Sequence, residues 1–388
     1  MPALTKKDIR AHFSKGILPA NCEIKQGLES GEISLVETSG TTDDKITNIW
    51  NQKWWDESEA ASWKLNAFTS KVATGNHHEA ILVNPKNVGI VSDDIDLPME
   101  KRLVSRFLYL NEKTNPLTWS RALYERMIHE LNVFRPTILE ANPSYLARLC
   151  RFINTHEIAV FCPEAIVLTY EYTTHFHKQQ IQQAFHDVPL ISSYGTTETG
   201  YVFMECEHGK LHQNSDYCRV DFQPFKKEFG GPSVGRILVT PLRNPWSYII
   251  RFDTGDIVQI NDASSCACGR KNGIILQSVK GRKANLTLTA DNKPVTLQEL
   301  DDSISVMQGI EEYKLIQTNN KSFELHLVSK RNDKNQIERE ATDILSSIYG
   351  NQIDVSVTFD AAIAPESSGK YLLAATNFPI HIEDYLEK

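Results

Sequence analysis

Short apolar runs alternate with amphipathic stretches over roughly the first 280 residues of this chain of 388, and this alternation restricts the fold more than any other feature. Buried strands are predicted at 80–84, 137–142, 165–170 and 189–195. Helices are predicted between them at 121–134, 144–156 and 177–187, where apolar residues recur at helical spacing. Strands that alternate with helices form βαβ units, so the sequence predicts an α/β fold with a mostly parallel sheet.

The pattern changes twice further along the chain. Residues 218–260 are strand-rich with Gly and Pro between the runs, which predicts a β-rich part of the same domain. After Gly281 the order is helix (296–307), hairpin (311–330), helix (334–350) and strand (353–359), which predicts a small α+β unit. We therefore predict two domains, 1–281 and 282–388.

Composition excludes several classes of protein. The net charge of −8 disfavours general binding to nucleic acid or to anionic lipid. No apolar run approaches the roughly 20 residues that cross a bilayer, and the charged N-terminal segment lacks an apolar signal core, so we expect a cytoplasmic protein. Seven cysteines, an odd number, argue against a disulfide scaffold.

A polar loop follows the apolar residues 35–36 and consists of Thr38, Ser39, Gly40, Thr41 and Thr42. Hydroxyls and open backbone N–H groups in such a loop can hold a phosphate, and a plain polar turn has the same composition. Two carboxylates, Asp43 and Asp44, come next and would repel a triphosphate.

A second polar cluster, residues 192–200, directly follows the apolar residues 189–191. Thr197 and Glu198 are then expected at the carboxyl edge of the sheet, where α/β proteins bind ligands. Glu198 could bind Mg²⁺ beside a triphosphate, because that ion prefers carboxylate and phosphate oxygens. Alternatively, Thr196 or Thr197 caps a helix with Glu198 in its first turn.

Two further positions carry single polar groups. Asp256 follows a Thr-Gly turn between predicted strands, where a carboxylate could accept both hydroxyls of a ribose or simply belong to a hairpin. Lys370 follows Ser-Ser-Gly near the C-terminus, and a lone lysine on such a loop is usually solvated.

Cysteine and histidine gather in two short segments, 206–212 and 266–268. Zinc prefers these ligands, and a structural zinc site closes with four of them. We predict structural Zn²⁺ held by Cys206, Cys266, Cys268 and one histidine, with His212 preferred to His208. Reduced, unliganded thiols beside a turn are the alternative.

Taken in this order, the motifs resemble the adenylate-forming (AMP-binding) superfamily, whose members join a carboxylic acid to AMP and pass the acyl group to a nucleophile. The phenylacetate–CoA ligase branch, with its relatives among coenzyme synthetases and capsule-locus ligases, is the nearer resemblance. It is carried by LTKKDIRAHF (4–13), NPSYLARL (142–149), MECEHGKLH (204–212) and CACGR (266–270). The resemblance implies a nucleotide- and acid-binding domain over 1–281 and a mobile domain over 282–388.

The same resemblance implies the role of each motif residue. The loop of Thr38, Ser39, Gly40, Thr41 and Thr42 would hold the β- and γ-phosphates of ATP. Adenine, the acyl pocket and the α-phosphate would be contacted by Tyr194, Gly195, Thr196 and Thr197. Glu198 would bind Mg²⁺, Asp256 the ribose, and Arg282 would mark the hinge. Lys370 would bridge the carboxylate and the α-phosphate, and Gly195, Tyr145, Tyr170 and Tyr172 could line an aryl pocket.

Two departures from the family pattern bear on function. Asp43 stands where the family usually has the last glycine of its phosphate loop, and Ala284-Asn285 stands where it has two aspartates in its hinge. We expect adenylation of a carboxylic acid, favoured to be aromatic, with transfer to coenzyme A. Transfer to a carrier-protein thiol or an amine is the second reading, and a binding or scaffolding subunit without catalysis is the third. A homodimer is implied by the resemblance alone.

Overall fold

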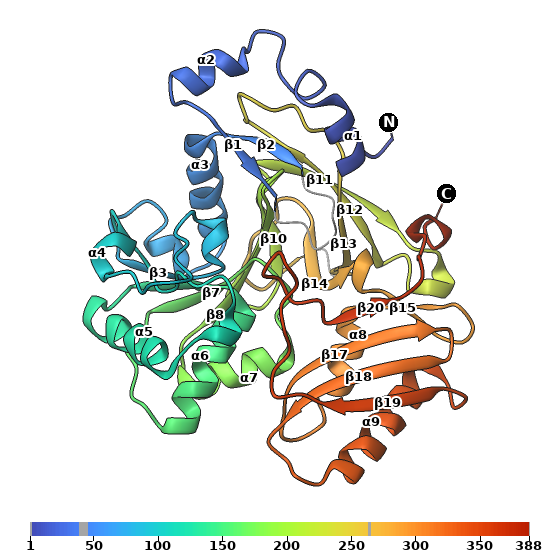
Figure 1. The fold of residues 1–388 in the computed structure, drawn as a ribbon. Coiled ribbons are helices and arrows are strands. Elements are labelled where there is room, and N and C mark those ends of the chain that lie inside the picture. Colours follow the sequence, from blue (N-terminus) through green and yellow to red (C-terminus); the bar gives the residue numbers. More distant parts are fainter. Residues whose placement is uncertain (1, 39–45, 263–264, 388) are drawn as a thin grey trace.

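The computed structural model describes residues 2–38, 46–262 and 265–387, which form a large N-terminal part and a smaller C-terminal part (Figure 1). The large part contains one twelve-stranded sheet in the order β11-β12-β13-β14-β10-β9-β8-β7-β6-β3-β5-β4. Its strands are β3 (Glu79–Leu82), β4 (Leu103–Val104), β5 (Phe107–Tyr109), β6 (Ile138–Ala141), β7 (Ala165–Leu168), β8 (Leu190–Thr196), β9 (Gly200–Glu205), β10 (Leu211–Gln213), β11 (Cys218–Pro224), β12 (Val234–Pro241), β13 (Phe252–Ile260) and β14 (Ile275–Arg282).

The sheet is parallel where strands and helices alternate in the sequence and antiparallel where they do not. Neighbours among β5, β3, β6, β7 and β8 pair in parallel, and the strands from β8 to β11 pair antiparallel. This confirms the α/β class and the β-rich part predicted from 218–260.

Helices cover the parallel strands on both faces. The longer ones are α3 (Gln52–Trp63), α5 (Arg121–Phe134), α6 (Pro143–His156) and α7 (His175–Ala184). On one face, α5 and α6 bury an apolar core against β6 that includes Leu139 and Tyr145. Asn142 caps α6 with Pro143 at its first position, a sequence signal for a helix start. The short helices are α1 (Lys6–His12), α2 (Ile24–Glu29) and α4 (Met99–Arg102), and Met99 of α4 packs against this core.

The other face of the sheet lies under α3. There Trp63 packs with Ile138, Val167 and Ile191. Because side chains alternate along a strand, residues two positions from these share that face. The same face therefore carries the polar residues Glu79, Glu140 and Ser193, as the registers of β3, β6, β7 and β8 require.

The C-terminal part is a four-stranded sheet, in the order β19-β18-β17-β20, with two helices. Its elements are α8 (Leu297–Ile304), β17 (Ile310–Asn319), β18 (Ser322–Ser329), α9 (Lys334–Tyr349), β19 (Asp354–Phe359) and β20 (Ala374–Thr376). Two small sheets pair β1 (Ser34–Glu37) with β2 (Thr47–Trp50) and β15 (Thr287–Leu288) with β16 (Pro294–Val295). The α+β unit predicted after Gly281 is present, and its boundary with the first domain stays a prediction.

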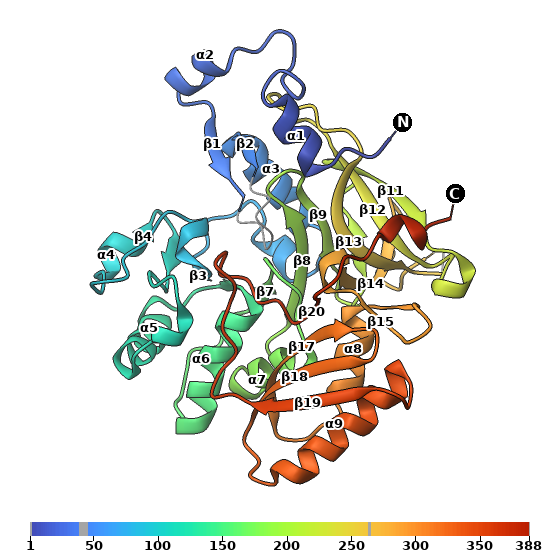
Figure 2. The same ribbon diagram turned by 45° about the vertical axis from the view of Figure 1, so that its right-hand side comes forward.

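The segment between β19 and β20 leaves the C-terminal sheet and reaches the large part (Figure 2). Asn84 Nδ2 donates a hydrogen bond to Ser368 O at 3.4 Å, and Tyr371 N donates to Glu171 Oε2 at 3.2 Å. Lys370 lies between these two attachment points. Among the described residues, no helix has the length and apolar character needed to cross a membrane.

Candidate active site

A cavity of about 1390 Å³ lies where the two parts meet, beside the carboxyl ends of β7 and β8. Many of the residues predicted for nucleotide or substrate binding line it: Thr38, Tyr170, Tyr194, Gly195, Thr196, Thr197, Glu198, Asp256, Arg282 and Lys370. The predicted phosphate-loop residues Ser39, Gly40, Thr41 and Thr42 lie outside the described residues, as do Asp43 and Asp44. The motifs that are far apart in the sequence thus meet in one place.

The predicted aryl-pocket residues do not all line this cavity. Tyr170 and Tyr172 do. Tyr145 is fully buried in the core between β6 and the helices, with its ring centroid 5.6 Å from that of Trp119 in an edge-on contact. The helical position that the sequence offered as substrate-facing is therefore filled by an inward-pointing core side chain.

Asp256 lies on β13 and is held between two neighbours. Tyr194 Oη donates a hydrogen bond to Asp256 Oδ2 at 2.8 Å, and Arg282 Nε lies 3.5 Å from Asp256 Oδ1. Burial and the adjacent Asp256 carboxylate raise the pKa of Tyr194 well above its usual range, so its hydroxyl keeps its proton. The antiparallel register that pairs Asp256 with Arg282 explains the contact, because the two residues lie opposite each other.

Glu198 lies in the turn between β8 and β9 and is 6% exposed. Its Oε1 is buried with no hydrogen-bond partner among the described residues. Lys6 Nζ lies 3.5 Å from that oxygen. A carboxylate oxygen with free lone pairs at the cavity wall can accept a hard cation such as Mg²⁺. The sequence analysis did not identify Lys6. It is the first of two lysines at the start of a helix, and nothing in the sequence distinguishes it from a solvated lysine.

Lys370 reaches the cavity from the segment that crosses between the two parts. Burial, and then the nearby positive charge of Arg282, lower its pKa, while Glu171 and Asp256 oppose that shift. Gly369 precedes it with φ of +80°, and a Cβ there would lie 1.6 Å from Asn84 Nδ2. Only glycine fits that close approach, so Gly369 helps to aim Lys370.

Glu171 is a second residue that the sequence interpretation missed. It accepts hydrogen bonds from Ser144 N and Ser144 Oγ and, at 3.2 Å, from Tyr371 N. Burial raises its pKa and these hydrogen bonds oppose that effect. Glu171 thereby attaches the lysine-bearing segment to the N-cap region of α6. It follows a buried strand in the sequence, and no other signal would have singled it out.

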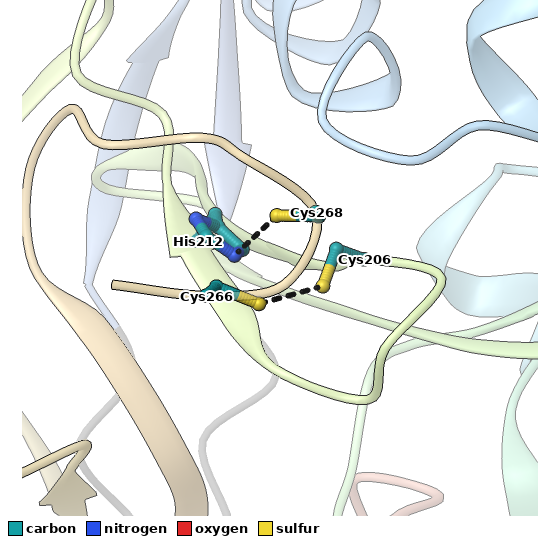
Figure 3. A group of neighbouring side chains, drawn as sticks. All are labelled: Cys206, His212, Cys266 and Cys268. Atoms are coloured by element: carbon teal, nitrogen blue, oxygen red, sulfur yellow. Dashed lines mark hydrogen bonds between the residues drawn. The ribbon is translucent and has the colours of Figure 1, made fainter. Parts of the chain in front are cut away.

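The cysteine and histidine residues predicted to bind zinc come together between β9, β10 and the loop before β14 (Figure 3). The ligand atoms of Cys206, His212, Cys266 and Cys268 lie within 4.8 Å of one another. Cys206 Sγ and Cys266 Sγ are 3.7 Å apart, and Cys268 Sγ is 3.3 Å from His212 Nε2. Tetrahedral zinc with bonds of about 2.3 Å to sulfur places two sulfurs about 3.8 Å apart, so this spacing fits zinc.

His208, the competing histidine, is not one of this group. Its backbone N–H donates a hydrogen bond to Cys206 Sγ at 3.4 Å. His212 lies on β10, whose pairing with β9 and β14 holds it between the two cysteine segments.

Comparison with known proteins shows which folds this arrangement is similar to. Residues 287–377 match the family described as the CapK C-terminal domain, and no curated protein matches the chain. A 2-hydroxyisobutyryl-CoA ligase in the postadenylation state aligns with a TM-score of 0.71 and 14% identity, over 97% of this chain and 80% of that chain. The anthranilate CoA ligase AuaEII with anthranoyl-AMP aligns with 0.58 and 13%, over 87% and 65%. The amide bond synthetase McbA from Marinactinospora thermotolerans aligns with 0.56 and 12%, over 88% and 67%.

The chain therefore has the fold of adenylate-forming ligases. The particular arrangement of its two parts is more similar to one state of the 2-hydroxyisobutyryl-CoA ligase than to others. The TM-score is 0.71 for the postadenylation state, 0.56 for an open conformation and 0.53 for the thioesterification state. At these identities the likeness concerns the fold, so the activity has to be argued from the site.

Proposed function

We propose that this protein activates a carboxylic acid with ATP as an acyl-adenylate, releases pyrophosphate and transfers the acyl group to coenzyme A. One observation carries the proposal. Lys370, Glu198 and Asp256 come from three distant segments, and all three line the same cavity. A chain that served only as a scaffold would have no need for a lysine, a carboxylate with an oxygen that accepts no hydrogen bond and a second acid around one space.

The chemistry follows from the charges. A carboxylate oxygen attacks the α-phosphorus and the bond to pyrophosphate breaks, so two anions approach each other and need positive charge nearby. Lys370 supplies that charge between the carboxylate and the α-phosphate, and Lys6 adds to it at the Glu198 side. Glu198 would hold Mg²⁺, which neutralises phosphate charge when bound. The Asp256 carboxylate, held by Tyr194, would accept hydrogen bonds from the ribose hydroxyls.

The acceptor is proposed from the fold and from the sequence resemblance. Two of the three aligned enzymes are CoA ligases by their descriptions, and the third forms amide bonds. Coenzyme A is our first candidate, and a carrier-protein thiol or an amine is the alternative. We also propose that the C-terminal part turns about the Gly281–Arg282 joint between the two half-reactions. An aryl acid of the phenylacetate type remains our proposal from Tyr170 and Tyr172.

We further propose that Cys206, His212, Cys266 and Cys268 hold structural zinc. The donor set of three thiols and one imidazole, and the near-tetrahedral spacing of its atoms, support this. The ion would tie the loop before β14 to the turn after β9. All four positions are occupied by protein ligands, so the zinc would have no open site for catalysis.

Acid-dependent ATP–pyrophosphate exchange across a panel of aryl and aliphatic acids tests the proposed activity. We expect exchange with at least one acid and a loss of about 100-fold or more in Lys370→Ala, because the cation acts on the developing charge. Lys321→Ala, at an exposed position of the C-terminal part, is the matched control and should leave exchange unchanged. Undiminished exchange in Lys370→Ala would remove that residue from the mechanism. No exchange with any acid, together with no ATP binding, would favour the scaffold reading.

A further inference from the structure

Two buried carboxyl groups and one half-buried carboxyl group line the part of the cavity that α3 covers. Glu79 and Glu140 are 3% and 4% exposed and occupy neighbouring strands on the same sheet face. Glu59 approaches them from α3. Each has one described partner: Tyr201 donates to Glu59, Tyr170 Oη donates to Glu140 Oε1 at 2.6 Å, and the His77 ring lies 3.1 Å from Glu79.

The cations near these three carboxyl groups are too few to neutralise them if all three were ionised. Among the described residues, Glu59 and Glu140 form no ion pair, and Glu79 pairs only with His77. Burial and the Arg106 charge lower the pKa of His77, which favours the neutral ring. Arg106 is the nearest cation, and its guanidinium donates to that ring and lies over Phe107 rather than against a carboxylate. Burial and mutual repulsion raise the pKa of Glu59 and of Glu140 to about 8.

The cluster is not arranged for a metal ion. Among the described residues, the only group of three or more Cys, His, Asp or Glu with ligand atoms near enough to share an ion is the Cys206 group. The carboxyl groups line a space, but their oxygens do not meet at a single point. Such an arrangement fits a ligand larger than an ion, with several N–H groups that can donate to different carboxyls.

Two further features point to an organic ligand in the same space. Ser193 is 7% exposed, lines the cavity on the same sheet face as Glu140, and its Oγ has no hydrogen-bond partner among the described residues. Such a group leaves a polar interaction unmade unless a ligand supplies it. Aromatic rings of Trp55, Phe107 and Tyr109 form other parts of the wall, and ring faces attract cations.

The position of the cluster relates it to the proposed reaction. Ser193 precedes Gly195 by two residues on β8, so it lies about 7 Å along the strand from this residue, which the sequence resemblance assigns to the acyl pocket. Glu140 lies two strands across from β8, about 10 Å away at ordinary strand spacing. An acid whose carboxylate meets Lys370 would therefore extend its far end toward the three glutamates.

We infer that the acid substrate carries a positively charged nitrogen, an amine or a guanidine, that binds among Glu59, Glu79 and Glu140 at the end of the cavity remote from Lys370. This rests on the proposed adenylation, since it identifies that pocket as the acid site. A linear or aryl spacer joins the two charged ends. A neutral acid of the same shape would offer these carboxyls no positive charge and would bind more weakly.

Direct binding and exchange with matched acids test the inference. Each amine-bearing acid is paired with a neutral acid of equal size: ω-amino acids with alkanoic acids of the same chain length, and aminomethylbenzoic acid with ethylbenzoic acid. Titration calorimetry measures binding of the acids alone, so it reports on the pocket whether or not adenylation occurs. We expect the amine-bearing acid of a pair to bind about 10- to 100-fold more tightly, the range for hydrogen bonds to charged groups.

Glu140→Gln and Glu59→Gln keep the shape of the side chain and remove the carboxyl group that can ionise when a cation binds. Each should reduce the preference for the amine about 10-fold while ATP affinity stays unchanged. Glu100→Gln, at an exposed position, is the control. Equal or tighter binding of the neutral acids, an unchanged preference in both variants, or no binding of either series would each overturn the inference. Absence of exchange and of ATP binding, with the amine preference intact, would instead remove the proposed adenylation and leave a binding site for cationic acids.

Discussion

Lys370 lies in surroundings that oppose its own charge. It is partly buried, and Arg282 and Lys6 add positive charge nearby, so its pKa is lowered. Two acids, Glu171 and Asp256, act in the opposite direction but do not cancel the shift. The site is therefore prepared for anionic ligands, because a carboxylate and a phosphate that enter the cavity restore the balance of charge.

This environment predicts a pH effect on adenylation. Lys370 acts only when protonated, and deprotonation above its folded pKa removes the charge, so the exchange rate falls as pH rises. Because burial lowers that pKa, the fall should begin below the ordinary lysine value of about 10.4. Lys370→Arg keeps its charge at high pH and should lose this alkaline decline, although its maximal rate is lower. The measurement is the rate of ATP–pyrophosphate exchange as a function of pH, for both proteins, with an acid that supports exchange. The same alkaline decline in both proteins would contradict the assignment.

Single residues also show where sequence interpretation stops. Asp256 and Lys370 could be picked out because they stand in recognisable motifs in a recognisable order. Lys6 and Glu171 could not, since their roles arise from contacts with residues far away in the chain: Lys6 with Glu198 and Glu171 with Tyr371. Tyr145 stands in a motif too, yet the side of α6 on which it lies faces the core.

Among the elements, the short strand β10 lies between β14 and β9, next to the cysteine cluster. Strand β10 has three residues, and Cys266 and Cys268, with the pair of Arg270 and Glu207, join the loop before β14 to the segments around β10. A bound ion would hold these pieces together, because structural zinc sites contribute directly to folding free energy.

Metal analysis tests this element. We expect about one zinc per chain in purified protein, the content that a single four-ligand site gives. Cys268→Ser should lose the zinc and lower the melting temperature, and a strong chelator should have the same effect on the unaltered protein. Cys162→Ser, at an exposed cysteine outside the cluster, is the control. Zinc-free protein with an unchanged melting temperature would contradict the site.

The sheet face under α3 predicts a second effect on stability. The pKa of Glu140 is about 8 when folded, against about 4.3 for an unfolded glutamate, so the folded state binds the extra proton between these values. Its contribution to stability is then present at low pH and is lost as pH rises toward 8, by at most about 1.4 kcal/mol per pH unit.

Glu140→Gln removes this titration. The melting temperature of the variant, relative to that of the unaltered protein, should rise steadily from pH 5 to pH 8. Over this range only the unaltered protein takes up a proton at position 140 when it folds, and this uptake becomes less favourable as pH rises. Thermal unfolding in a series of buffers measures the difference. A difference that stays constant with pH would show that Glu140 is ionised in the folded protein throughout.

At the scale of the whole molecule, two parts close around one cavity, and a segment of the C-terminal part delivers a lysine into it. The order of strands and helices could be predicted because each element carries its own periodicity and caps. The position of the C-terminal tail could not be predicted from the sequence. Ile382, Tyr385 and Leu386 return to the large part and pack against Phe225 and Ile257, a contact between segments that no local pattern encodes.

The polar sheet face under α3 could not be predicted from the sequence either. Glu79 and Glu140 each lie inside or beside a short apolar run, where a lone glutamate looks like a solvent-facing residue of a half-buried strand. Only the register of four strands and the position of α3 show that these carboxyls face one buried space. That register, rather than any motif, changes the expected acid from a plain aryl acid to one with a positive charge.

Acyl-adenylate formation can be followed with oxygen-18 in the carboxyl group of an acid that supports exchange. If the carboxylate attacks the α-phosphorus, one carboxyl oxygen stays with AMP when the acyl group moves to coenzyme A. Attack on the α-phosphorus therefore predicts AMP with one labelled oxygen and pyrophosphate without label, both measured by mass spectrometry. Unlabelled AMP, or label in inorganic phosphate, would mean that the acid is not activated as an acyl-adenylate and would contradict the account.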